Sequence, residues 1–310
     1  MTSETSLQMT LLPGARELLA LHAREVPQRD DLCGAFCGAL ALGAAGVSVS
    51  PGGAEPIDQD AVALAAGSVV GVHADHGMLP FAETGRRDYR LELPLVEDSS
   101  VSGTTAAGLA HALEELSGGR LAAIPFSGPW TVSKLDGLFD LTAALERPVA
   151  LLANLHTRHL WGSHPSAGEL LGYLLDGALA GPAPDWEVGH FVCIVGRLSG
   201  PGGGLYGVAD TYPSLGTGGV HLQPRERLAA AIERREEPAG GLLVLVDVQD
   251  APALRSGAGA LGLVEGLWDN GTVVAATAVA ANASPGAAAA AAAAASKPAG
   301  GATTDSARAS

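Results

Sequence analysis

The stretch Gln28-Arg29-Asp30-Asp31-Leu32-Cys33-Gly34-Ala35-Phe36-Cys37 is the most informative part of this 310-residue sequence. At Cys33 a polar segment gives way to small and apolar residues that continue through Leu42, which predicts a buried helix beginning at Cys33. A thiol at a helix N-terminus faces the positive end of the helix dipole, which favours the thiolate. The amide of Gln28, just upstream, is placed to donate a hydrogen bond to an oxyanion. The segment indicates a nucleophilic cysteine, and the alternative is a buried structural cysteine in a small-residue helix.

A cysteine nucleophile needs a base and a group that orients the base. His190 stands at the mouth of an apolar strand predicted over 191–196, and a Gly-rich turn at 200–204 leads to a second strand over 205–209. Asp210 follows that second strand. An antiparallel pairing of the two strands brings Asp210 to the His190 end, where its carboxylate can fix the imidazole tautomer. The alternative for His190 is a surface histidine or one hydrogen-bonded in the core.

In this order, Gln28, Cys33-Gly34, Cys37, His190 and Asp210 resemble the pattern of papain-like cysteine peptidases of the double-glycine leader-processing type and their stand-alone relatives. Weaker similarities lie between these residues, at 57–68, 103–109 and 146–152. The resemblance covers roughly residues 15–246. It departs from the family at Thr211, where the family usually has Pro, and at Phe36, where it prefers Ala.

The resemblance implies an α+β, papain-like fold in which an N-terminal helical part carries the Cys helix and a following antiparallel sheet carries His and Asp. It implies the roles of nucleophile for Cys33, base for His190, orienting group for Asp210 and oxyanion donor for Gln28. The implied activity is thiol-dependent hydrolysis of a peptide or amide bond. Two alternatives stay open: an acyltransferase that forms amides in a biosynthetic pathway, and a non-catalytic peptide-binding module of the same fold.

The domain organisation follows from the same patterns. We expect a papain-like domain over 11–250, with insertions near 73–96 and 161–187 that account for the long spacing between Cys33 and His190. A C-terminal hairpin extension is predicted over 251–283, with strands at 263–268 and 272–279 around the turn at 269–271. Residues 284–310 are mostly Ala, Ser, Gly, Pro and Thr with no large apolar side chain, which predicts a disordered tail.

Apolar periodicity and capping residues predict the remaining elements. Asp58 is a candidate N-cap for a helix within 56–67, and Thr104 is a candidate N-cap for a helix over 104–116. The other expected helices are 14–24, 33–42, 135–145, one within 162–184, and 224–236. The other expected strands are 121–126, 149–154 and 242–246.

Composition excludes several classes of protein. The sequence has 33 acidic and 18 basic side chains, a net charge of −15, which argues against a nucleic-acid partner. No apolar run is long enough to span a membrane, and we expect no signal peptide. An odd count of three cysteines suits a reducing compartment, so a cytoplasmic location is expected. The sequence carries no signal for the oligomeric state.

Metal and cofactor sites are not expected. The histidine sets His156, His159, His164 and His73, His76 lack a Cys or carboxylate at ligand spacing. The Gly-rich stretch at 202–207 fits a dinucleotide fingerprint in letters, but it precedes a predicted strand where that motif requires a helix. The partner that the resemblance implies is a peptide or amide substrate, and no cofactor is expected.

Overall fold

A computed structural model describes residues 6–53, 55–234 and 238–273, and in this part the chain has an α+β fold. An eight-stranded sheet has the order β10-β4-β9-β5-β6-β7-β8, and β1 pairs with β6 outside that path. Every pairing in this sheet is antiparallel. Its strands are β1 (Gln8–Leu11), β4 (Leu121–Ser127), β5 (Ala150–His156), β6 (Gly189–Ser199), β7 (Gly204–Ala209), β8 (Val220–Pro224), β9 (Gly241–Asp247) and β10 (Val264–Glu265).

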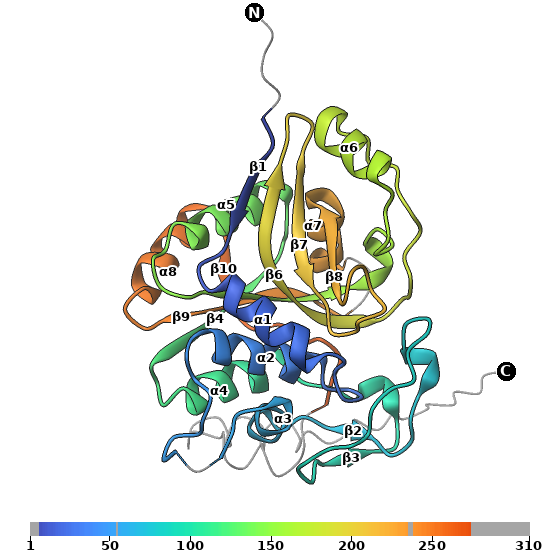
Figure 1. Cartoon of the computed structure of the whole chain (residues 1–310). Helices are drawn as coiled ribbons and strands as arrows, with labels where there is room; N and C mark the ends of the chain where they lie inside the picture. The colour runs from blue at the N-terminus through green and yellow to red at the C-terminus, as the bar shows by residue number, and fades with distance from the viewer. Residues whose placement is uncertain (1–5, 54, 235–237, 274–310) are drawn as a thin grey trace, which may run out of the picture. The chain divides into compact units, whose positions relative to one another are not determined.

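Helices cover both faces of the sheet (Figure 1). On one side lie α1 (Ala15–Glu25), α2 (Cys33–Ala44) and α4 (Ala106–Leu116), with α3 (Gln59–Ala66) outside them. On the other side lie α5 (Val132–Ala143), α7 (Arg225–Glu233) and α8 (Ala251–Ala260). Because both faces are covered, the central strands β5 and β9 are buried along nearly their whole length, where a strand with one solvent-facing side would alternate.

The remaining elements are short and lie within or next to the two predicted insertions. A small parallel pair is formed by β2 (Val70–Gly71) and β3 (Leu95–Val96), and 3₁₀ turns occur at η1 (His76–Met78), η2 (Ser99–Val101) and η3 (Thr157–His159). In the second insertion a helix predicted within 162–184 is limited to α6 (Ala167–Asp176), which has a capping box at its start and Gly177 at its end.

Helix α2 begins at Cys33, as predicted, and its small residues let it approach the sheet closely. A Cβ placed on Gly34 would lie 3.0 Å from the Cβ of Thr104 and 3.2 Å from the ring of Phe191 on β6. No larger residue fits there without displacing one of these neighbours. The glycine after the cysteine therefore sets how near the helix N-terminus stands to the strand that carries His190.

Of the two predicted helix N-caps, one is confirmed and the other is wrong. Asp58 caps α3 as predicted, since its Oδ1 accepts a hydrogen bond from the Ala61 N–H at 2.9 Å. The assignment of Thr104 as the cap of α4 is wrong, because Thr105 holds that place and accepts from the Gly108 N–H. The Thr104 hydroxyl is buried and bonds to Ser68 Oγ at 2.8 Å instead, a tertiary contact that local sequence does not show.

The predicted antiparallel pair formed by residues 191–196 and 205–209 is confirmed as β6 and β7. Strands β1 and β8 and helix α8 were not predicted. The segment assigned to a hairpin extension opens with α8, and Val264–Glu265 pair with Ser127 and Phe126 of β4. Most of the second arm predicted for that hairpin, from residue 274, and the tail 284–310 lie outside the described residues. Within the described ranges, no helix has the length and apolar character needed to cross a membrane.

Candidate functional site

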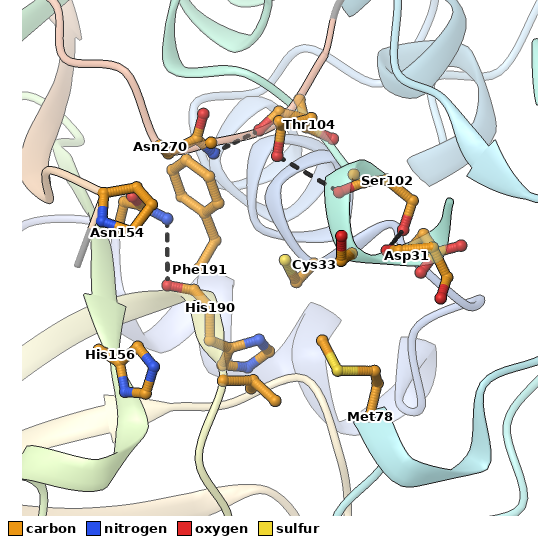
Figure 2. Close-up of a pocket in the computed structure, with 18 of the residues that line it drawn as sticks. Asp31, Cys33, Met78, Ser102, Thr104, Asn154, His156, His190, Phe191 and Asn270 are labelled. Carbon is orange, nitrogen blue, oxygen red and sulfur yellow. Dashed lines mark hydrogen bonds between the residues drawn. The ribbon is translucent and has the colours of Figure 1, made fainter. Parts of the chain in front are cut away.

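A cavity of about 280 Å³ lies where the N-terminus of α2 meets the start of β6. Three of the four residues predicted for the site, Gln28, Cys33 and His190, line this cavity. Figure 2 shows Cys33 near the centre of the view, with the His190 ring beside it and Met78 across from His190. The fourth predicted residue, Asp210, follows β7 and lies behind His190.

His190 and Asp210 form a buried pair. The Nε2–H of His190 donates to Asp210 Oδ1 at 2.9 Å, and both side chains are almost fully buried. The Thr211 backbone N–H donates to the same carboxylate oxygen at 2.7 Å. The predicted strand–turn–strand route thus brings Asp210 to the His190 end of β6.

Electrostatics in this pair favour the charged forms of both side chains. Burial by itself lowers the pKa of His190, but the charge and hydrogen bond of Asp210, with a smaller contribution from Cys33, raise it well above its usual range. Burial by itself raises the pKa of Asp210, but His190 and then His221 lower it well below its usual range. An imidazolium beside Cys33 is therefore favoured at neutral pH.

Cys33 is the one partly exposed thiol of the three, and Cys37 and Cys193 are buried. The N-cap position of α2 is Leu32, and no side chain in the described part of the chain caps this helix, so its first N–H groups face the cavity without a capping group. Burial, followed by the neighbouring Cys193, raises the pKa of Cys37 well above its usual value, which keeps that thiol protonated. The arrangement singles out Cys33 as the thiol able to meet a ligand.

Gln28 is buried beside the cavity and is fixed through its backbone. Its N–H donates to the Thr211 carbonyl at 3.0 Å, which ties the segment before Cys33 to the residue after Asp210. The side-chain Oε1 is buried and has no hydrogen-bond partner among the described residues. The side-chain oxygen of Gln28 therefore accepts no hydrogen bond from a described residue, which is uncommon for a buried polar atom.

The first predicted insertion clamps the segment that carries Gln28. The N–H of Asp30 donates to the Arg86 carbonyl at 2.8 Å, and the N–H of Arg86 returns a 2.8 Å bond to Asp30 Oδ1. The Arg86 guanidinium also reaches the Pro27 carbonyl, and the Tyr89 hydroxyl donates to the Asp30 carbonyl. Residues 86–89 thus hold the approach to Cys33 in one conformation.

Two aromatic rings cover His190: Trp186, in the second insertion, and Tyr212, which follows β7. The Trp186 ring meets the His190 ring edge-on at 5.0 Å, and the Tyr212 ring stacks on it at 6.4 Å with an angle of 18° between planes. Trp186 and Tyr212 also contact each other edge-on. This cover excludes water from the His190–Asp210 bond, which strengthens it. Neither ring was predicted from the sequence to be part of the site.

Two further histidines contact Asp210 and were also missed. His22 of α1 bonds through Nε2 to the Asp210 backbone carbonyl at 2.5 Å, and His221 of β8 bonds through Nε2 to Asp210 Oδ2 at 3.2 Å. Burial is the main cause of a lowered pKa for His22, so that ring is a neutral donor. The alternation of polar and apolar residues in 220–224 is the signal that could have identified β8 as a strand with His221 on a defined face.

Much of the remaining lining of the cavity is polar. Asn270 donates through Nδ2 to the Thr104 carbonyl at 3.0 Å, and Asn154 donates to the His190 carbonyl at 3.4 Å (Figure 2). Asp31, at a φ of 64°, also lines the cavity and accepts a bond from the Gly71 N–H. Amides, hydroxyls and a carboxylate in this lining suit a ligand rich in hydrogen-bonding groups, as a peptide is.

Metal ligation has no support in this geometry: among the described residues, no group of three or more His, Cys, Asp and Glu side chains is arranged to hold a metal ion. His156 and His159 do approach each other, with ring centroids 6.1 Å apart.

Comparison with curated proteins finds no match. A family model matches residues 12–269, a range that includes Gln28, Cys33, His190, Asp210 and His221. Since this match covers most of the chain, the protein belongs to a family of unknown function, DUF6885.

Proposed function

We propose that this chain is a thiol-dependent hydrolase that acts on a peptide or amide bond through Cys33, His190 and Asp210, in a papain-like arrangement. The observation that carries the proposal is the placement of an accessible thiol at an uncapped helix N-terminus, in one cavity with a histidine that a buried carboxylate keeps charged. A structural cysteine requires none of these three features.

The first half of the reaction forms a thioester. The Cys33 thiolate attacks the carbonyl carbon, a C–S bond forms, and the carbonyl electron pair moves to oxygen. The Gln28 amide and the Cys33 backbone N–H donate to that oxyanion. His190 then gives its proton to the leaving nitrogen, the C–N bond breaks, and the amine departs.

The second half of the reaction releases the acid. His190, now neutral, takes a proton from water, whose oxygen attacks the thioester carbon. The C–S bond breaks, and the carboxylic acid leaves as the Cys33 thiolate and the His190 imidazolium are restored. Asp210 stays ionised throughout and stabilises each imidazolium state.

The test is cleavage of a peptide library by the full chain, with new termini identified by mass spectrometry. Cys33→Ala and His190→Ala are each expected to abolish cleavage, and Gln28→Ala is expected to slow it by about 10² to 10³-fold, as for one oxyanion donor. Cys37→Ala is the matched control: it removes a buried thiol one turn further along α2 and should leave cleavage in place.

Two outcomes would contradict the proposal. Cleavage that survives Cys33→Ala would assign the activity to a contaminant or to another group. A wild-type chain that binds peptides without cleaving them, and whose Cys33 does not react with iodoacetamide faster than a free thiol, would support the peptide-binding module. Adding an amine acceptor to the same assay distinguishes hydrolysis from acyl transfer by the mass of the product.

A further inference from the structure

We propose that His221 is a positioning residue: fixed in one tautomer by Gln223, it holds the second carboxylate oxygen of Asp210 and so sets the orientation of the His190–Asp210 pair. The inference rests on the proposed function, because it assigns a role in organising that same site. It adds two residues of β8 to the site, His221 and Gln223, and neither of them lines the cavity.

The orientation of the Gln223 amide is determined by its two bonds to Trp161. The Trp161 N–H donates to Gln223 Oε1 at 2.8 Å, and Gln223 Nε2 donates to the Trp161 carbonyl at 2.9 Å. Exchanging the amide oxygen and nitrogen would place two donors and two acceptors face to face. The backbone of Trp161 therefore fixes which end of the amide is the nitrogen.

The fixed amide then determines the tautomer of His221. The Gln223 Nε2 lies 3.1 Å from His221 Nδ1 and has a second hydrogen to donate there. Nδ1 must accept, so the ring proton is on Nε2, and that N–H donates to Asp210 Oδ2 at 3.2 Å. A proton on Nδ1 would instead place two donors, the His221 Nδ1–H and the Gln223 Nε2–H, face to face.

Among the described residues, the side chain that hydrogen-bonds Asp210 Oδ2 is His221, and no second donor reaches this oxygen. The space beside Asp210 and His221 is about 10 Å³, room for one water molecule at most. Both side chains are about 2% exposed. Oδ1 accepts from His190 and from the Thr211 N–H, whereas Oδ2 accepts from His221. Without His221, a buried anionic oxygen would lose its hydrogen bond.

The ionisable groups that face Asp210 come from four elements. His22 of α1 bonds its backbone carbonyl, His190 of β6 and His221 of β8 bond its carboxylate, and Cys33 of α2 lies beyond His190. On the far side, Asp185 lines the same small space and accepts from the Ser163 N–H at 2.6 Å. A change at His221 therefore acts on Cys33 through Asp210 and His190.

The test measures the alkylation rate of Cys33 by iodoacetamide from about pH 4 to 9, a range that brackets the ordinary pKa values of His and Cys. His221→Leu is expected to lower the rate at about pH 6 by about tenfold and to converge on the wild type at the alkaline end, where the thiolate forms without help. His221→Gln, which offers an amide N–H to Asp210, should restore the wild-type profile to within about twofold.

Leu222→Ala is the matched control, because it trims a half-buried apolar side chain of the same strand that does not contact Asp210. It should reduce the free energy of unfolding without moving the pH profile. A His221→Leu profile that coincides with the wild type would overturn the proposal, since a purely structural role leaves the profile unchanged.

If His221→Leu does not fold, nitrogen NMR of the histidine side chains in the wild-type chain tests the tautomer of His221 directly. A His221 ring with its proton on Nε2 and a bare Nδ1 supports the proposal, and a proton on Nδ1 overturns it. Failure of the proposed function has a different signature: wild-type Cys33 would then alkylate like a free thiol, with a midpoint of about 8.5, whatever the tautomer of His221.

Discussion

Asp210 is the residue on which the contacts of the site converge. Its carboxylate accepts from His190, His221 and the Thr211 N–H, and its carbonyl contacts His22. In Asp210→Asn one carboxylate oxygen becomes an amide NH₂ that faces an N–H donor. Since the tautomer of His221 is fixed by its neighbour, we expect the change to destabilise the fold by about 1–3 kcal/mol, through one broken buried hydrogen bond.

The difference in free energy of unfolding between the wild type and Asp210→Asn should depend on pH. His190 has a raised pKa, so its contribution is complete below the unfolded value of 6.5 and declines as pH rises above it. Asp210 has a lowered pKa, so its contribution is complete above 3.8 and declines as pH falls below it. Urea unfolding should give the largest difference between these two values. A difference that is constant with pH would show that the pair is not charged.

Little of this convergence could be predicted at the level of single residues. Gln28, Cys33, His190 and Asp210 were identified because each stands at a recognisable element boundary in the sequence. His22 lies in an ordinary amphipathic helix, and its partner is a backbone carbonyl 188 positions away. Trp186 lies in a loop without periodicity. Contacts of this kind depend on tertiary packing, which no local pattern encodes.

At the scale of elements, α2 and β6 were predicted and β8 was not. Helix α2 is a long run of small apolar residues, and β6 with β7 is marked by apolar strands around a Gly-rich turn. Strand β8 is short and pairs only with β7 among the described strands. Its alternating polar residues are typical of a loop as well as of an edge strand. The boundary of α4 was misplaced because two adjacent threonines compete for one cap.

The close contact of α2 with its neighbours gives a prediction about glycine. Gly34→Ala should cost about 1–3 kcal/mol, because its Cβ meets two buried side chains at 3.0 and 3.2 Å and neither can withdraw. Gly172→Ala in α6 is the control, since its nearest neighbour is at 3.7 Å. It should stabilise the chain by about 0.5–1 kcal/mol through helix propensity. Urea unfolding measures both, and equal effects would contradict the packing described for α2.

The clamp between the first insertion and the Gln28 segment gives a second prediction. Asp30→Ala removes the acceptor of the Arg86 N–H, so we expect Gln28 to lose its fixed position and peptide cleavage to slow by about tenfold. Alkylation of Cys33 should not change, since His190 and α2 are untouched. Glu92→Ala, an exposed change in the same insertion but outside residues 86–89, is the control and should leave both rates as they are. A parallel loss of alkylation and cleavage would indicate general unfolding instead.

At the scale of the whole described unit, the site is assembled from segments far apart in the sequence. The proposed nucleophile comes from the helices on one side of the sheet, the proposed base and its carboxylate partner come from β6 and the end of β7, and the aromatic cover comes from Trp186 of the second insertion and from Tyr212. The coarse α+β class and the antiparallel sheet could be predicted from apolar periodicity. The pairing of β9 between β4 and β5, which places the apolar core, could not, because it joins strands about a hundred residues apart.

The central claim is that Cys33 and His190 form a thiolate–imidazolium pair, and the ultraviolet absorbance of the thiolate tests it most directly. The difference in absorbance between the wild type and Cys33→Ala, followed as pH is raised, isolates the ionisation of this one sulfur, because Cys37 and Cys193 are buried in both. The account predicts that the thiolate signal is already present at about pH 6, and that it is lost at that pH in His190→Ala. A thiolate that appears only near pH ~8.5, as for a free thiol, and does not depend on His190 would contradict the account.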